Sequence, residues 1–175
     1  MEKILIVVDM QNDFVTGALG SSEARNIVPN VVRKVEEARN NGIIPIFTID
    51  KHYLDQDYSA SIEGKYVPPH CVEDSWGVQI IPELQDFRYY TAHKFTYAYN
   101  CWGDWNGMLQ DLDEIEICGV CTDICVISNA LVLRSMYPDV QITVDASCCA
   151  GSKPYLHDAA LEVMKSCNIN VINEA

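Results

Sequence analysis

Short apolar runs recur along the chain, and segments with apolar residues at helical spacing separate several of them. Continuous apolar, β-branched runs are typical of strands that are buried on both faces. They predict strands over residues 4–8, 43–49, 88–92, 115–120, 140–144 and 169–172. The three-to-four spacing of apolar residues predicts helices over 29–40, 104–112 and 154–167, and another helix that begins just before residue 124.

Strands that alternate with helices are joined by right-handed parallel crossovers, which indicates an α/β protein. We therefore expect a three-layer α/β/α doubly wound, Rossmann-like sheet of five to six parallel strands. The length of 175 residues, without a repeat or a linker, fits a single domain over residues 1–175. Such sheets bind ligands beyond the carboxyl ends of their strands, where the strand order reverses.

One strand-to-helix transition, over residues 117–126, carries a cysteine at a notable position. Thr122 is the expected N-cap, which makes Cys125 the third helical residue. Free N–H groups and the helix dipole would lower the pKa of a thiol there and favour the nucleophilic thiolate. Free cysteines are also among the most buried residue types, so inert packing is the alternative that position alone leaves open.

Other reactive side chains also follow predicted strands. Asp9 comes directly after the strand over 4–8, Asp50 after the strand over 43–49, and Lys94 shortly after the strand over 88–92. Each has an ordinary structural explanation, because aspartate often ends a strand and most lysines lie at the surface. Together with Cys125 they form four reactive groups at one edge of one predicted sheet, which indicates an active site.

A long irregular stretch over residues 50–77 contains two of the four histidines, His52 and His70, together with Asp50 and Glu63. An insert of this length in a compact domain is usually functional or disordered. Imidazole and carboxylate groups together suit zinc, iron or manganese. Histidines in loops are mostly just solvated, so the bare pattern leaves a metal site open.

Composition narrows the partners. The formal charge of −13, without a basic cluster, argues against nucleic acid and against an anionic membrane surface. The start of the chain lacks a signal-peptide pattern and no apolar run reaches membrane-spanning length, so we expect a cytoplasmic protein. The eight cysteines are then free or functional thiols, with no pairing deducible from their spacing. The oligomeric state, a homo-oligomer included, stays open.

Four motifs taken together carry a resemblance to a known family. They are Val-Asp-Met-Gln-Asn-Asp-Phe at 8–14, Asp-x-His at 50–52, His-Lys at 93–94 and Gly-Val-x-Thr-Asp-x-Cys-Val at 119–126. Over essentially the whole chain this combination resembles the isochorismatase-like cysteine hydrolases. Within that family it is most similar to the nicotinamidases.

The resemblance implies a catalytic trio of Asp9, Lys94 and Cys125. It also implies a cis peptide bond between Val120 and Cys121, which would aim the N–H groups of Cys121 and Cys125 as an oxyanion hole.

A metal site is implied as well. Asp50, His52 and His70 match the family's ligand set, and Glu63 matches a glutamate that some members add. The expected cofactor is a divalent transition metal, zinc first, with iron or manganese as alternatives.

The implied activity is that of a cysteine-dependent amidohydrolase, as used in NAD salvage. It would deamidate nicotinamide, or a related pyridine carboxamide, to the acid and ammonia through a thioester intermediate. The implied partner is therefore a small-molecule amide.

Two departures concern the substrate pocket. Val67 stands where nicotinamidases commonly have an aromatic residue against the ring, which leaves Phe14 and Tyr97 as candidate pocket aromatics. The segment 99–102, Tyr-Asn-Cys-Trp, replaces the small residues usual after the lysine.

Two other functions remain open from the sequence. One is a metal-free amidase or ureido hydrolase of the same superfamily. The other is a non-enzymatic thiol redox sensor that uses Cys118, Cys121 and Cys125.

Overall fold

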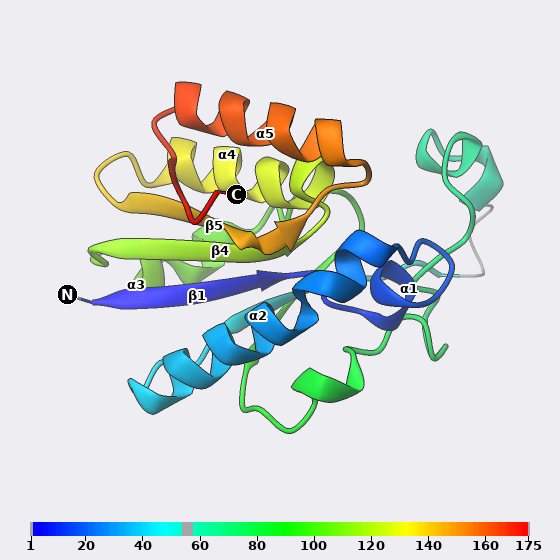
Figure 1. Ribbon diagram of the computed structural model, residues 1–175, viewed down its shortest axis with the longest axis horizontal. Helices are drawn as coiled ribbons and strands as arrows, with labels where there is room; N and C mark the ends of the chain where they lie inside the picture. Colours follow the sequence, from blue (N-terminus) through cyan, green and yellow to red (C-terminus); the bar gives the residue numbers. More distant parts are fainter. Residues whose placement is uncertain (1, 54–57, 175) are drawn as a thin grey trace.

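A computed structural model describes residues 2–53 and 58–174 of the chain (Figure 1). Its centre is a sheet of six parallel strands in the order β3-β2-β1-β4-β5-β6. The strands are β1 Lys3–Val8, β2 Ile46–Asp50, β3 Tyr90–Lys94, β4 Glu114–Val120, β5 Gln141–Ala150 and β6 Asn170–Ile172. The predicted doubly wound α/β fold is confirmed.

The apolar runs form the predicted strands because they lie in the middle layer, where side chains are buried on both faces. Strand ends differ by a few residues from the prediction. β2 starts only after Pro45, which has no N–H for a strand ladder and whose carbonyl accepts a hydrogen bond from Tyr90 N. β3 ends at Lys94 itself, and β5 continues to Ala150 instead of ending at residue 144.

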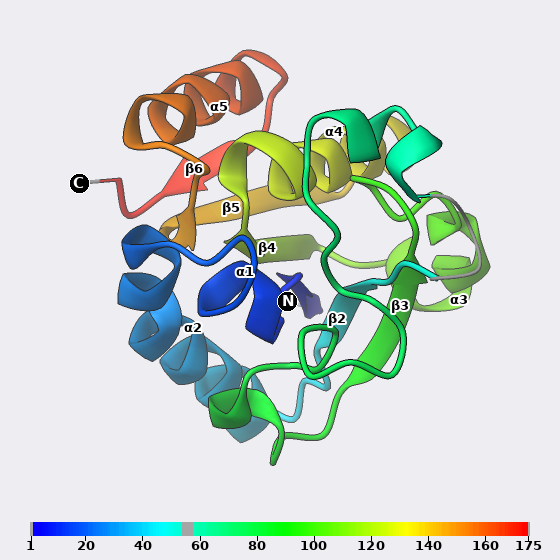
Figure 2. The same ribbon diagram turned by 90° about the vertical axis from the view of Figure 1, so that its right-hand side faces the viewer.

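Helices cover both faces of the sheet (Figures 1 and 2). The long helix α2, Ser22–Asn40, lies on one face, and α4, Ile127–Met136, and α5, Pro154–Ser166, lie side by side on the other. Two short helices, α1 Asn12–Val15 and α3 Asn106–Leu109, belong to connections. None of the described helices combines the length and the hydropathy of a membrane-spanning segment.

The first long helix begins earlier than predicted. Ser21 caps it by accepting a hydrogen bond from Ala24 N at 3.0 Å, so Pro29 lies inside the helix instead of opening it. The buried face is the predicted one, since Val31 and Val35 are fully buried.

The connection before β4 is also less helical than predicted. A 3₁₀ turn, Trp102–Trp105, and the four-residue α3 replace the helix predicted over 104–112. The irregular stretch over 50–77 contains 3₁₀ turns at Tyr58–Ala60 and Glu63–Lys65, and its residues 54–57 lie outside the described part of the chain.

The strand order reverses between β1 and β4, and one glycine allows these strands to approach there. Gly119 has a φ of +118°, and a Cβ on it would lie 2.1 Å from the carbonyl oxygen of Val8. Only glycine is compatible with both constraints. The carboxyl ends of β1, β2, β3 and β4 therefore open onto one side of the molecule, where reactive side chains gather.

Candidate active site

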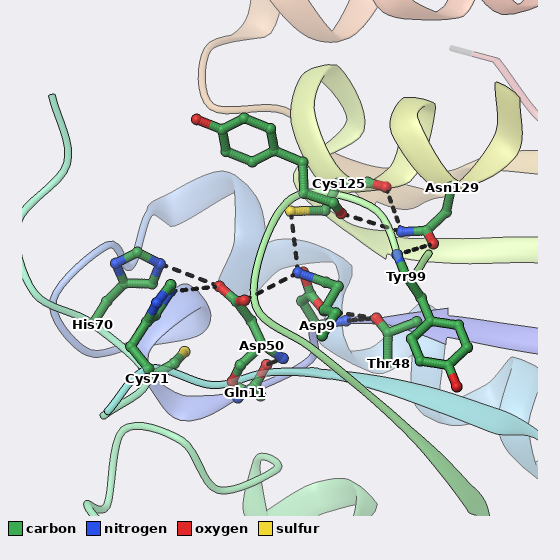
Figure 3. Close-up of polar contacts among 12 residues, drawn as sticks. Asp9, Gln11, Thr48, Asp50, His70, Cys71, Tyr99, Cys125 and Asn129 are labelled. Carbon is green, nitrogen blue, oxygen red and sulfur yellow. Dashed lines mark hydrogen bonds and ion pairs between the residues drawn. The ribbon is translucent and has the colours of Figure 1, made fainter. Parts of the chain in front are cut away.

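The structure brings together the four strand-end residues named from the sequence. Figure 3 labels three of them, Asp9, Asp50 and Cys125. Asp9 follows β1, Asp50 ends β2 and Lys94 ends β3. Cys125 lies in a single helical turn, Thr122–Val126, directly after β4. All four side chains are buried, which sets them apart from ordinary strand-end residues.

The Lys94 ammonium group connects the other three. Its Nζ lies 2.7 Å from Asp9 Oδ2, 3.4 Å from Asp50 Oδ1 and 3.7 Å from Cys125 Sγ. Only 1% of the side chain is exposed. Burial by itself would lower the pKa of Lys94, but the carboxylates of Asp9 and Asp50 outweigh it and raise the pKa. Lys94 is therefore a permanent positive charge inside the site.

Asp9 is fixed by the neighbouring strand and by its own backbone. Its Oδ1 accepts a hydrogen bond from Thr48 Oγ1 at 2.6 Å, and its backbone N–H donates to Thr48 Oγ1 at 3.1 Å. The residue has a φ of +50°, in the left-handed region, where aspartate is tolerated better than most residues. Burial raises the pKa of Asp9 against the opposing charge of Lys94. A carboxylate with a raised pKa is a better proton acceptor.

The pKa expected for Cys125 was wrong in direction. Cys125 is only 5% exposed. Burial raises its pKa well above the ordinary value, the charge of Asp9 raises it further, and Lys94 opposes both only in part. Desolvation of the thiolate outweighs the helix terminus, so the resting group is the neutral thiol.

The turn that carries Cys125 also differs from the prediction. Thr122–Val126 is a π turn, with Ile124 N and Val126 N both donating to Cys121 O, at 3.1 and 3.0 Å. Thr122 is no N-cap, because its hydroxyl lies 2.8 Å from Nδ1 of His157, a residue given no role from the sequence. The peptide bond between Val120 and Cys121 is cis, as the resemblance implies.

Beside the trio lies a group of possible metal ligands. Single ligand atoms of Asp50, His52 and His70 all lie within 4.8 Å of one another. The Nε2 atoms of His52 and His70 are 3.3 and 3.2 Å from Asp50 Oδ2. Glu63 stands further off, with its Oε1 3.9 Å from His70 Nε2.

The chemistry of this group fits a divalent transition metal. His70 Nδ1 lies 2.9 Å from the carbonyl of Pro68, which leaves Nε2 free as a ligand and fixes the ring. Asp50 Oδ1 and His52 Nε2 are buried without a hydrogen bond. Burial alone would raise the pKa of Asp50, but the two histidines and Lys94 hold it below its usual range. An ionised carboxylate and two imidazoles are the donors that zinc, iron and manganese accept.

Gln11 supports the metal-ligand group and was missed in the sequence. Its side-chain amide accepts a hydrogen bond from Asp50 N and donates to Asp50 O, both at 2.8 Å, and also donates to Val78 O. It thus fixes the end of β2 against β1 and against the loop that follows His70. Its place in the motif at 8–14, two residues after Asp9, was the signal available in the sequence.

The three residues expected in the substrate pocket differ in placement. Phe14 is buried and packs edge-on against His70, with ring centroids 5.4 Å apart. Tyr97 is 42% exposed, and Val67 is half-buried with its N–H bonded to Glu63 O. A cavity of about 350 Å³ opens beside the metal-ligand group, lined in part by His52, Glu63 and Phe95.

Known proteins share both the sequence pattern and this architecture. A family model described as an isochorismatase domain matches residues 3–175. A protein of Arabidopsis thaliana named as a probable inactive nicotinamidase is 28% identical, over 94% of this chain and 89% of its own length. A crystal structure of a Bacillus subtilis nicotinamidase/pyrazinamidase has 26% identity, a TM-score of 0.85, and coverage of 99% of this chain and 100% of that one. A pyrazinamidase of Pyrococcus horikoshii in complex with zinc has the same identity, TM-score and coverage.

Proposed function

The chain belongs to the isochorismatase domain family, and from that premise we propose that it is a cysteine-dependent amidohydrolase. Its proposed substrate is nicotinamide or a related pyridine carboxamide, which it converts to the acid and ammonia. The nicotinamidase and pyrazinamidase relatives support an amide hydrolase. The observation that carries the mechanism is the buried Lys94 ammonium group, which contacts both a carboxylate and a thiol.

In the first step the Asp9 carboxylate takes the proton of the Cys125 thiol while the sulfur attacks the amide carbon. Because burial raises the pKa of the thiol, proton removal and attack have to occur together. The new C–S bond forms as the carbonyl pair moves to oxygen. Lys94 stays protonated and offsets the charge of Asp9 throughout.

The oxyanion that forms would accept hydrogen bonds from the backbone N–H groups of Cys121 and Cys125. Backbone donors suit this task because they are fixed before the reaction begins. The amide nitrogen then takes the proton from Asp9, the C–N bond breaks, and ammonia leaves a thioester on Cys125.

Hydrolysis of the thioester completes the cycle. Asp9, again a carboxylate, takes a proton from water as the oxygen attacks the acyl carbon. The C–S bond breaks, the acid departs, and the sulfur recovers the proton that Asp9 holds.

Asp50, His52 and His70 would hold a divalent transition metal, with Glu63 near enough to complete or support the set. Such an ion supplies a Lewis acid that can ligate a pyridine nitrogen and so orient the ring. An aliphatic amide has no such nitrogen, which is why we favour a pyridine carboxamide. Phe14, Tyr97 and Val67 are the side chains proposed to enclose the ring.

The experiment is an ammonia-release assay on zinc-loaded enzyme with nicotinamide, pyrazinamide and benzamide. Benzamide is the matched control, because it keeps the ring and the amide but lacks the ring nitrogen. We expect nicotinamide and pyrazinamide to react with kcat/KM at least about 10-fold above that of benzamide. That factor is the expected effect of the one contact that benzamide lacks, the contact with the ring nitrogen. Equal rates for benzamide would refute recognition through the ring nitrogen. If none of the three reacts, the proposed substrate class is wrong.

A further inference from the structure

One buried amide connects the nucleophile turn to the segment that follows Lys94 (Figure 3). Asn129 lies in α4, one helical turn after Cys125, and is fully buried. Its Nδ2 donates to Cys125 O at 2.8 Å and to Tyr97 O at 3.3 Å. Its Oδ1 accepts from Tyr99 N at 3.0 Å and from Trp102 Nε1 at 3.1 Å.

These four contacts use the full capacity of the side chain, which has two N–H donors and an oxygen with two lone pairs. One contact is with the carbonyl of the proposed nucleophile. The other three are with residues 95–102, which we call the wall segment. No other natural side chain of this size offers two N–H donors together with a carbonyl oxygen, so the link depends on asparagine.

The wall segment carries Tyr97 to the edge of the site. Partial burial raises the pKa of Tyr97, and the negative charges of Glu63 and Asp50 raise it further. The residue is 42% exposed, and its backbone carbonyl lies 3.3 Å from Asn129 Nδ2. The backbone of Tyr97 is held by the same amide that holds Cys125.

The wall segment is also anchored on its far side. Trp102 is fully buried, and its carbonyl accepts a hydrogen bond from the hydroxyl of Tyr137 at 3.0 Å. The same hydroxyl oxygen lies 2.8 Å from Asn106 Oδ1, so its one proton is shared between the two acceptors. The bulky residues at 99–102, which depart from the small residues expected there, are thus built into the core.

We propose that Asn129 is a positioning residue that holds Cys125 and Tyr97 at one fixed spacing, and so matches the nucleophile to the wall of the ring pocket. This rests on the proposed function, because it assigns Tyr97 to the substrate ring. Loss of the link should affect both parameters. The thiol loses its orientation, which lowers kcat, and Tyr97 loses its place against the ring, which raises KM.

The test compares Asn129→Ala, Tyr97→Ala and the double variant as zinc-loaded full-length enzymes with nicotinamide. We expect Asn129→Ala to lower kcat and to raise KM, each by about 10-fold. In the Tyr97→Ala background the same substitution should change KM by less than about twofold, because the side chain through which it acts is gone. An unchanged KM effect in that background would overturn the coupling to Tyr97.

Tyr137→Phe is the matched control. It removes the hydrogen bond to Trp102 O on the far side of the wall segment and leaves the side chain of Asn129 unchanged. We expect its kcat and KM to stay within about twofold of wild type. If Asn129 had a purely structural role, Asn129→Ala and Tyr137→Phe would change kcat and KM to the same extent when they lose the same stability. If Asn129→Ala does not fold, Asn129→Ser, which keeps one donor, replaces it in the same comparison.

The rate of alkylation of Cys125 by iodoacetamide, followed by mass spectrometry, separates this proposal from the function. We expect Asn129→Ala to change that rate by at least about fivefold, and Tyr137→Phe by less than about twofold. A wild type without amidase activity but with this difference would reject the function and keep the link between Asn129 and the thiol. Alkylation within twofold for both variants would reject the link.

Discussion

Among the residues that the structure describes, two clusters of buried and half-buried charges differ in how many of their polar atoms have a hydrogen bond. The site cluster consists of Asp9, Asp50, His52, His70 and Lys94. In the described part of the chain, the three buried side-chain atoms without a hydrogen bond all belong to it: Asp9 Oδ2, Asp50 Oδ1 and His52 Nε2. These atoms have only ion-pair contacts.

The second cluster, which we call the Lys34 cluster, consists of Lys3, Lys34, Glu116 and Asp145. It joins α2 to β1, β4 and β5, and every carboxylate oxygen of Glu116 and Asp145 has a partner. Lys34 binds both acids and Lys3 binds Glu116. Asp145 also accepts hydrogen bonds from Ser147 and Asn173.

The difference indicates two uses of buried charge. Full pairing offsets the cost of desolvation and fixes a helix against the sheet. Buried atoms that have an ion pair but no hydrogen bond are less fully satisfied, and such atoms persist where a proton or an ion has to be received. The following predictions test this contrast.

The largest expected effect is on activity, from a change at Cys125, whose sulfur lies 3.7 Å from Lys94 of the site cluster. Cys125→Ala should lower ammonia release by more than about 10³-fold, because the proposed nucleophile is gone. The fold should persist, as judged by circular dichroism and by the melting temperature.

Cys121→Ala is the control for that variant, since Cys121 keeps its backbone N–H as alanine. Should Cys121→Ala lose activity while Cys125→Ala keeps it, the nucleophile has been assigned to the wrong thiol.

The next effect is on stability, within the Lys34 cluster. Lys34→Met should lower the free energy of unfolding by about 2–4 kcal/mol, because it leaves two buried carboxylates without their shared cation. Its kcat should stay near that of wild type. Lys165→Met, which breaks exposed ion pairs, is the control and should cost less than about 1 kcal/mol. Equal losses in the two variants would show that burial does not matter here.

Zinc should stabilise the folded protein through its ligands in the site cluster, and this gain should not depend on the Lys34 cluster. At about 100 times its dissociation constant, zinc adds about 2.7 kcal/mol, or about 5–10 °C in melting temperature for a chain of this length. Lys34→Met should keep this gain and His52→Ala should lose it. Elemental analysis after reloading should find one equivalent of metal per chain. Less than a tenth of an equivalent would exclude the site.

A smaller effect concerns the substrate pocket. Val67→Phe should lower KM for nicotinamide several-fold, because an aromatic contact contributes about 0.5–1.5 kcal/mol beyond its buried area. Kinetic assays with the Lys34→Met variant as a reference for altered stability will measure it. A KM that stays constant would place residue 67 away from the ring.

The smallest expected effect is on how the free energy of unfolding changes at acid pH. Burial alone would raise the pKa of Asp145, but Lys34 and Ser147 lower it. A lowered pKa gives stability that is present above the ordinary value, about 3.9, and is lost as the pH falls through the folded value. The stability gap between wild type and Lys34→Met should therefore narrow below about pH 4. Chemical denaturation at several pH values can measure it, and a constant gap would contradict the pairing.

Sequence patterns were sufficient for the sheet and for the residues at its carboxyl edge. A run such as 115–120 has no other stable place than the middle layer, and parallel strands bring Asp9, Asp50 and Lys94 to one edge. Local signals were ambiguous at helix starts. Pro29 suits a first helical position, and only the contact of Ser21 with Ala24 N shows that the helix begins earlier.

Contacts between distant residues could not be predicted from sequence. Threonine is a favoured N-cap residue, but the hydroxyl of Thr122 forms its hydrogen bond with His157, in another helix. The direction of the pKa of Cys125 depends on burial by the whole fold. The Lys34 cluster gave no signal, because acidic residues within strands look like solvent-facing positions.

The position of Lys94 has a consequence for how activity responds to stress. β3 is the last strand at its edge of the sheet and is paired with β2 alone. Edge strands open locally at a lower free energy than central strands, well before the molecule unfolds. Fraying of this strand would withdraw the shared cation from both Asp9 and Asp50 while α2, α4 and α5 stay folded. Inactivation would then be a subglobal event, with fast amide exchange in β3 as its marker.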